Sequence, residues 1–133
     1  MNNAHEDVTL LPYTEKTYPE KLRLLKNPPE VLYVRGNADI LTGGPVVAVV
    51  GSRNASAYGL SVTSSFCRDF CEAGFTIVTG GARGIDSAAA ETALKYGGRL
   101  ILVLGCGVDI VYPPENAELF NRIILSGGAI ISE

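Results

Sequence analysis

VVAVVGSRNAS, residues 46–56, is an apolar run that ends at a glycine and continues into small and polar residues. A strand that is apolar at every position is expected to be buried on both faces, which is typical of a parallel sheet covered by helices. Similar runs return at residues 75–79, 100–104 and 129–132. The four runs predict four parallel strands.

The segments between these runs have the apolar spacing of helices, at residues 59–73, 86–96 and 116–125. The side chains expected to face inward from the first and third of them are Val62, Phe66, Phe70, Leu119, Ile123 and Ile124. Alternating strands and helices predict an α/β fold with a doubly wound, mainly parallel, Rossmann-like sheet. Because the pattern stops after four strands, we expect this sheet to be incomplete.

Residues 1–41 have a different pattern and are interpreted as an N-terminal extension. Tyr18, Leu22, Leu24 and Leu25 predict a short amphipathic helix that the Pro28-Pro29 pair must end, and residues 31–34 predict a short strand. The glycines and the proline of residues 41–45 indicate a turn. The predicted division is therefore an extension, 1–41, and a Rossmann-like domain that binds phosphate or DNA, 42–133.

Composition restricts the class of protein. The chain has 133 residues, of which 47% are hydrophobic, so one globular domain is expected. No apolar run is long enough for a membrane span, and the N-terminus has neither a basic start nor an apolar run. The 3 cysteines fit a reducing compartment better than a disulfide framework. We therefore expect a cytoplasmic protein without a membrane partner.

The loops that follow the predicted strands carry the functional signal, because ligands of open α/β sheets bind at the carboxyl ends of the strands. Glycines let the backbone approach a ligand, helix starts attract anions, and arginine matches the geometry of phosphate. The net charge of −3 argues against a broad basic face, so any nucleic-acid site must be local. The candidate DNA- or phosphate-binding residues are Gly51, Ser52, Arg53, Asn54, Gly80, Gly81, Arg83, Gly84, Gly105, Gly107, Tyr112 and Asn116.

A simpler interpretation is open for each of these residues. The glycines can serve tight turns and the arginines can be solvated. Tyr112 can stack on a base or anchor the chain by packing, and a carboxylate at Asp86 can cap the second helix. Glu133 is a candidate general base or a loose end of the chain.

Catalytic, metal and cofactor sites are not expected. The dinucleotide fingerprint and the Gly-Lys-Ser/Thr phosphate loop are absent. His5 is the only histidine and lies in a polar terminus, which leaves no Ser/His or Cys/His pair for the core. Cys67 and Cys71 lack further zinc ligands nearby in the sequence and are interpreted as core residues. We therefore expect a binding protein rather than an enzyme.

The sequence resembles the DprA/Smf family in a series of motifs that occur in order after residue 17. The matching residues are Tyr18-Pro19 with Leu22, Asn27-Pro28-Pro29, Val31 to Gly36, Val49 to Arg53 with Tyr58-Gly59, Gly80 with Ala82 to Asp86, Gly105 and Gly107 with Tyr112-Pro113 and Asn116, and Ile131 to Glu133. The family often carries a basic residue after the Tyr-Pro pair, where this chain has Pro114.

The resemblance implies a Rossmann-like protein that binds single-stranded DNA, helps to load the RecA recombinase and supports natural transformation, without known catalysis. Arg53 is then the first candidate for a contact with the DNA backbone. The resemblance leaves the oligomeric state open, with a homodimer as one option. An alternative is a Rossmann-like protein that binds or hydrolyses a nucleotide or a nucleotide-derived ligand. Gly81, an added glycine relative to the usual motif of the family, and the acidic pI of about 5.2 favour this alternative. A third interpretation is a fragment whose binding needs residues beyond Glu133.

Overall fold

A computed structural model describes residues 8–133, so the interpretation of His5 lies outside the described residues. One sheet contains all six strands, in the order β1-β2-β6-β5-β4-β3. The strands are β1 (Val8–Pro12), β2 (Val31–Gly36), β3 (Val46–Ala48), β4 (Thr76–Thr79), β5 (Arg99–Val103) and β6 (Ala129–Ser132). Strands β3 to β6 pair in parallel, and β2 pairs antiparallel with both β1 and β6. The predicted α/β class with a mainly parallel, Rossmann-like sheet is confirmed.

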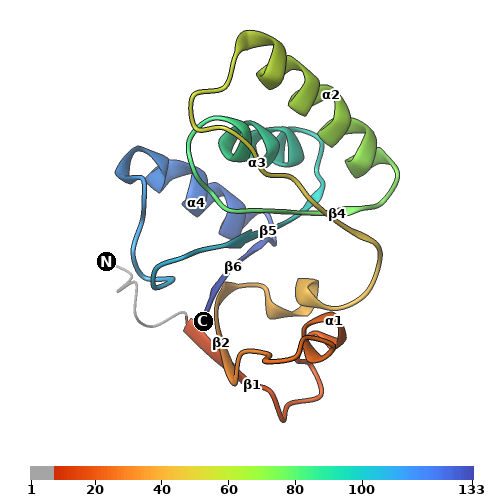
Figure 1. The fold of residues 1–133 in the computed structure, drawn as a ribbon, viewed down its shortest axis with the longest axis vertical. Helices are drawn as coiled ribbons and strands as arrows, with labels where there is room; N and C mark the ends of the chain where they lie inside the picture. The colour runs from red at the N-terminus through yellow and green to blue at the C-terminus, as the bar shows by residue number, and fades with distance from the viewer. Residues whose placement is uncertain (1–7) are drawn as a thin grey trace.

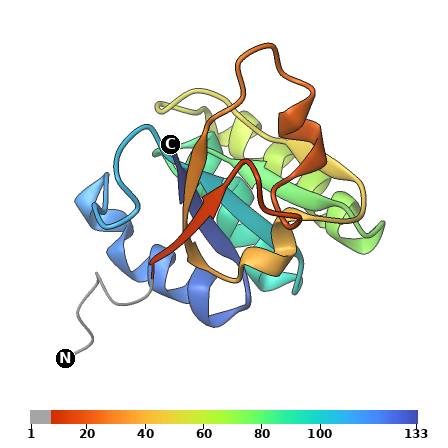
Figure 2. The same ribbon diagram turned by 90° about the horizontal axis from the view of Figure 1, so that it is seen from below.

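Three helices connect the parallel strands and cover one face of the sheet (Figures 1 and 2). They are α2 (Ala57–Glu72), α3 (Ile85–Lys95) and α4 (Ala117–Leu125), the last preceded by the 3-10 turn η2 (Pro114–Asn116). Successive strands lie in sequence order across the sheet, so crossovers of one hand place all three helices on the same side. Residues 8–133 therefore contain the part of the predicted doubly wound fold in which the helices cover one face of the sheet.

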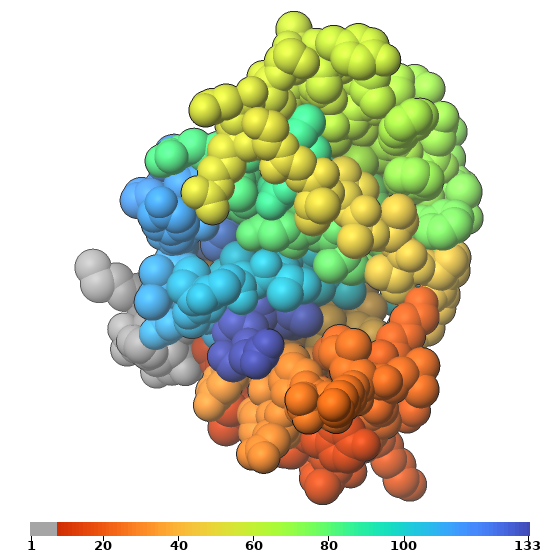
Figure 3. Space-filling model, viewed as in Figure 1, coloured from red at the N-terminus to blue at the C-terminus, as the bar shows by residue number. Residues whose placement is uncertain are grey.

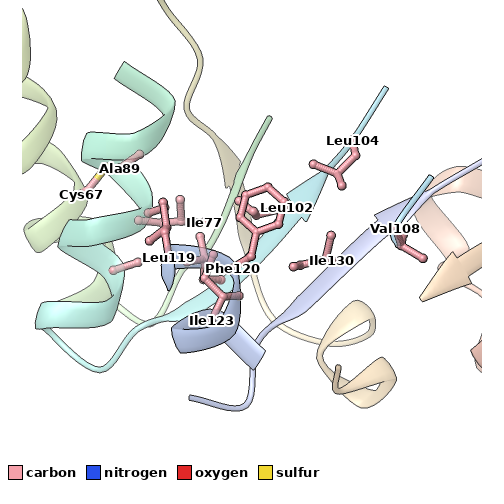
Figure 4. Close-up of a cluster of buried hydrophobic side chains, with 13 residues drawn as sticks. Cys67, Ile77, Ala89, Leu102, Leu104, Val108, Leu119, Phe120, Ile123 and Ile130 are labelled. Atoms are coloured by element: carbon pink, nitrogen blue, oxygen red, sulfur yellow. The ribbon is translucent and has the colours of Figure 1, made fainter. Parts of the chain in front are cut away.

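The main core lies between these helices and the sheet. Phe120 of α4 is fully buried and sits among side chains of the central strands, including Leu102 and Ile130 (Figure 4). From α3, Ala89, Ala90 and Ala93 are also fully buried. Alanine has almost no side chain to hold the helix away, so α3 can approach the sheet closely, as the sequence predicts.

The N-terminal segment covers the opposite face of β5 and β6. It contains α1 (Glu20–Arg23) and the 3-10 turn η1 (Ala38–Leu41) in addition to its two strands. Its Tyr18 and Val34 are fully buried in a second cluster with Ile101 of β5 and Ile131 of β6. The boundary between 1–41 and 42–133 remains a prediction, but strands from both parts belong to one sheet.

The expectation that the first apolar run is buried on both faces is wrong. The strand β3 is shorter than the run and occupies an edge of the sheet. Val46 is 39% exposed and Val50, beyond the strand, is 73% exposed. Val47 of β3, and Val49 just after it, are partly buried against the main core, so the apolar pattern of a central strand occurs here at an edge.

Two other apolar patterns predict buried side chains that the structure shows to be exposed. Phe66 was expected to face inward, but it is 59% exposed because α2 packs beside α3 and buries Thr63 and Cys67 instead. In the N-terminal segment the helix ends at Arg23, so Leu24 and Leu25 lie outside it and are 86% and 52% exposed. The strand β1 was not predicted, because its five residues contain no alternating apolar pattern.

Tyr18 provides a test of what stabilises the N-terminal segment internally. Its hydroxyl donates a hydrogen bond of 2.7 Å to the carbonyl oxygen of Pro29. Tyr18→Phe is expected to lower the free energy of unfolding by about 1–2 kcal/mol, because that carbonyl loses its partner in a partly buried position. Urea denaturation measures the loss, and Tyr58→Phe is the control because Tyr58 is 79% exposed. Equal stability of the two variants would contradict this role of the hydroxyl.

Candidate phosphate-binding site

Three loops at the carboxyl ends of β3, β4 and β5 converge on one hollow of about 340 Å³, which we call the loop pocket. The three segments meet on one face of the molecule in Figure 3, as yellow, green and light-blue atoms. The β3–α2 loop contributes Arg53, and the β4–α3 loop contributes Gly80, Ala82 and Arg83. The segment after β5 contributes Leu104, Gly105, Cys106, Tyr112 and Pro113. The loops therefore open on the same edge of the sheet, as the sequence predicts.

Gly84 holds the first two loops together. It has a φ of 77°, and a Cβ at this position would lie 2.2 Å from the carbonyl oxygen of Ser52. The amide of Ile85 donates a 3.1 Å hydrogen bond to that same carbonyl. Both contacts require a residue without a side chain at Gly84, because nothing larger fits between the two backbones. The loop that carries Arg53 is thus fixed to the start of α3.

Asn116 attaches the third segment to the second loop. Its Nδ2 donates hydrogen bonds to the Gly81 carbonyl oxygen, at 3.2 Å, and to the Ser87 Oγ, at 3.1 Å. Gly81 itself has a φ of 74°, in the left-handed region. The amide of Asn116 is therefore used by the protein, and this residue shapes the pocket without lining it.

Arg53 and Arg83 supply the positive charge of the loop pocket. Arg53 is exposed. Arg83 pairs with Glu115 through its Nε, and 55% of the Arg83 side chain is exposed. The hydrogen bond with the carboxylate raises the pKa of Arg83, and the same bond lowers the pKa of Glu115. Both groups are consequently charged at neutral pH.

The backbone donors are less available than the sequence suggested. The amide of Ile85 is already bonded to Ser52, and the amide of Ala82 donates to Asp86 Oδ2 at 3.3 Å. Asp86 is only 6% exposed and receives this bond from the loop ahead of the helix, whereas the N-cap position of α3 is occupied by Gly84. The expectation that Asp86 caps free amides of the helix is therefore corrected. The charge of the pocket rests mainly on guanidinium groups.

The structure separates the predicted residues into two groups. Those that line the loop pocket are Arg53, Gly80, Arg83, Gly105 and Tyr112. Those that do not line it are Gly51, Ser52, Asn54, Gly81, Gly84, Gly107 and Asn116. Of these, Gly107 lines a separate hollow with Tyr33, Ser132 and Glu133. Tyr112 is 59% exposed, which argues against the packing-anchor interpretation and leaves its side chain accessible to a ligand. Its peptide bond with Pro113 is cis.

Sequence reasoning missed several residues of the pocket. Leu104 and Cys106 flank the predicted Gly105, and their place after a buried strand was a usable signal. Glu115 was missed for a different reason. Its partner Arg83 lies 32 positions away, and no local pattern connects the two.

The described residues contain no group of three His, Cys, Asp or Glu side chains that could hold a metal ion. Burial raises the pKa of Cys67 to about 11 and also raises the pKa of Cys71. Raised thiol pKa values fit the interpretation of these cysteines as core residues. None of the helices in residues 8–133 is long and apolar enough to cross a membrane.

Comparison with known proteins gives one consistent family. The family model of DNA recombination-mediator protein A matches residues 9–133. The DNA processing protein DprA of Bacillus subtilis is 35% identical over 118 residues, which cover 89% of this chain and 40% of that protein. The chain thus spans well under half the length of this relative.

Solved structures agree with the sequence comparison. The crystal structure of DprA from Streptococcus pneumoniae has a TM-score of 0.84 and 33% identity, over 99% of this chain and 47% of that one. The Helicobacter pylori protein, solved to explain its single-stranded DNA binding mode, has a TM-score of 0.81 and 31% identity, over 97% of this chain and 56% of that one.

Gly84→Ala tests the contact that joins the first two loops. The substitution is expected to lower the free energy of unfolding by more than about 2 kcal/mol, because it adds a clash with the Ser52 carbonyl to the cost of a positive φ. Gly43→Ala is the matched control, since Gly43 has a φ of 84° but no atom within 4 Å of an added Cβ. The control should lose only about 1–2 kcal/mol. Urea denaturation of both variants checks this, and equal losses would show that the contact adds nothing.

Proposed function

Because the chain belongs to the DNA recombination-mediator protein A family, we propose that its loop pocket binds the phosphates of single-stranded DNA. The observation that carries the proposal is the presence of Arg53 and Arg83, from two different loops, at one hollow. Guanidinium groups offer several donors in a plane and match phosphate oxygens. The relative from Helicobacter pylori binds single-stranded DNA, which supports the polymer as ligand.

Tyr112 supports the choice of a nucleic acid over a simple anion. Its exposed ring lies at the same hollow as the two arginines. Aromatic rings hold single-stranded nucleic acids by stacking on bases, which is sequence-tolerant because every base has a π-face. We propose that a phosphate lies between the arginines while a neighbouring base stacks on Tyr112.

The wider role follows the family. We propose a cytoplasmic DNA-processing protein of transformation and recombination, with RecA as a partner and without catalysis. A homodimer belongs to the same proposal. Each of these features derives from the resemblance to relatives much longer than this chain, whereas the pocket derives from its own residues.

A nucleotide is the second candidate ligand. The volume of the loop pocket, about 340 Å³, lies at the small end of the range for small-molecule sites and so suits a compact ligand. Thermal-shift measurements with mononucleotides and with oligothymidine separate the two. Stabilisation by a mononucleotide alone would favour the second candidate.

Arg53→Ala is expected to weaken binding of a dye-labelled oligothymidine by about 10- to 100-fold, because charge-assisted hydrogen bonds are worth about 1.5–3 kcal/mol. Fluorescence anisotropy gives the dissociation constants. Arg68→Ala is the matched control, because Arg68 lies near the far end of α2 and pairs with Asp69 at 3.2 Å. The control removes the same charge and should change affinity less than twofold. Equal affinities of wild type and Arg53→Ala would contradict the proposed site.

The salt dependence of binding tests how many phosphates the protein neutralises. Two arginines that each neutralise one phosphate predict a slope of about −1.4 for log K against log salt concentration. Anisotropy titrations at several salt concentrations measure it. A slope several times steeper would mean that other cations carry the binding.

A further inference from the structure

Arg83 is held from outside the loop pocket. Its Nε donates to a carboxylate oxygen of Glu115, and the pair joins the β4–α3 loop to η2 across 32 positions of sequence. Arg83 lines the loop pocket, whereas Glu115 does not. Glu115 therefore contacts the guanidinium group from a position beside the pocket and leaves the hollow itself open.

The atoms of this pair leave part of Arg83 for a ligand. A guanidinium group has five N–H donors in a fixed plane. The hydrogen bond to Glu115 uses the single Nε–H, which points out from one edge of the planar group. The two terminal amino groups, with four donors, are not needed for this bond and form the fork that suits a phosphate.

The backbone beneath Glu115 is also fixed. The side chain of the neighbouring Asn116 donates hydrogen bonds to Gly81 and Ser87. Its backbone N–H donates to the Pro113 carbonyl oxygen at 3.0 Å. The segment that carries Glu115 is thus tied to the same loop that carries Arg83. A long, half-exposed arginine side chain would otherwise sample many rotamers, each with the charge in a different place.

We infer that Glu115 is a positioning residue, which holds Arg83 through Nε so that its terminal amino groups face a phosphate in the loop pocket. The inference rests on the proposed function, in that the pocket takes a phosphate-bearing ligand. A ligand then meets an arginine that is already ordered, and loses less side-chain freedom on binding.

The carboxylate has an opposing effect, because its negative charge repels an incoming phosphate. Glu115 is 53% exposed, so solvent and salt screen this repulsion. Since the hydrogen bond with Arg83 lowers the pKa of Glu115, the carboxylate is ionised at neutral pH. The sign of the net effect distinguishes the two roles.

The experiment compares wild type, Glu115→Ala, Glu115→Gln, Arg83→Ala and the double variant Arg83→Ala/Glu115→Ala. Glutamine keeps an oxygen that can accept the bond from Nε, whereas alanine does not. Binding is measured with two probes, an oligothymidine and inorganic pyrophosphate. Glu118→Ala is the matched control, because it removes one exposed carboxylate from the neighbouring helix α4. Thermal melting of each variant checks that it is folded.

Glu115→Ala is expected to weaken binding of both probes by about three- to tenfold, and Glu115→Gln to stay within about twofold of wild type. In the Arg83→Ala background the same alanine substitution should change nothing, because Glu115 acts through Arg83. Rescue by glutamine together with this loss of effect is a pattern that a merely structural role would not give.

Three results would overturn the inference. Tighter binding by both Glu115 variants would mean that repulsion dominates. A loss in Glu115→Ala that persists without Arg83 would mean a structural role. Unchanged affinity in Glu115→Ala would mean that Arg83 needs no partner.

The two probes separate this inference from the proposed function. If wild type binds pyrophosphate but not oligothymidine, the proposed function fails, and the variant pattern with pyrophosphate decides the inference alone. If wild type binds neither probe, both fail.

Discussion

The candidate site depends on the backbone contact between Gly84 and Ser52. Two loops that belong to different β-α units approach so closely here that no Cβ fits between them, and the Ile85 amide closes the contact with a hydrogen bond. This contact carries Arg53 to the hollow that Arg83 also lines. A glycine that permits a positive φ is thus a condition for this arrangement, although it does not line the loop pocket itself. Close packing supports this contact, because the Ile85 side chain fills the space against Gly51, where an added Cβ would lie 2.7 Å from the Ile85 Cγ1.

An acidic protein can still offer a local site for an anion. The chain carries a net charge of −3, but two guanidinium groups project from neighbouring loops, and the nearest partner, Glu115, neutralises only one of them. The loop amides, which sequence reasoning expected to bind anions, are partly used in holding the loops together. Backbone hydrogen bonds therefore hold the loops of the pocket in shape, and arginine side chains supply its positive charge. Side-chain charge acts over a longer range than an amide dipole, although solvent and salt screen it where the pocket is open to water.

Strand and helix signals gave most of the fold, because buried runs and helical spacing reflect local preferences and one shared core. The failures have physical causes. The run at Val46 is as apolar as a central strand, yet its place at the sheet edge follows from tertiary packing. Phe66 has the right spacing for burial, but the orientation of α2 is set by contact with α3. At the site, residues next to a strand end were predictable from topology. Glu115 and the structural role of Asn116 were not, because both depend on partners about thirty positions away.

The two hydrophobic clusters lie on opposite faces of the sheet and differ in their relation to the loop pocket. The helix-side cluster includes Leu104, which also lines the loop pocket, so packing on this face reaches the site directly. The cluster under the N-terminal segment contains Tyr18, Ile101 and Ile131, and none of these residues lines the pocket. That segment packs against β5 through Ile101 and against β4 through Val78, and the carboxyl ends of these two strands start the third and second loops. Strand β2 adds to this by pairing with β6, which in turn pairs with β5. The N-terminal segment therefore supports the sheet from its second face, and the loops after the parallel strands form the candidate site.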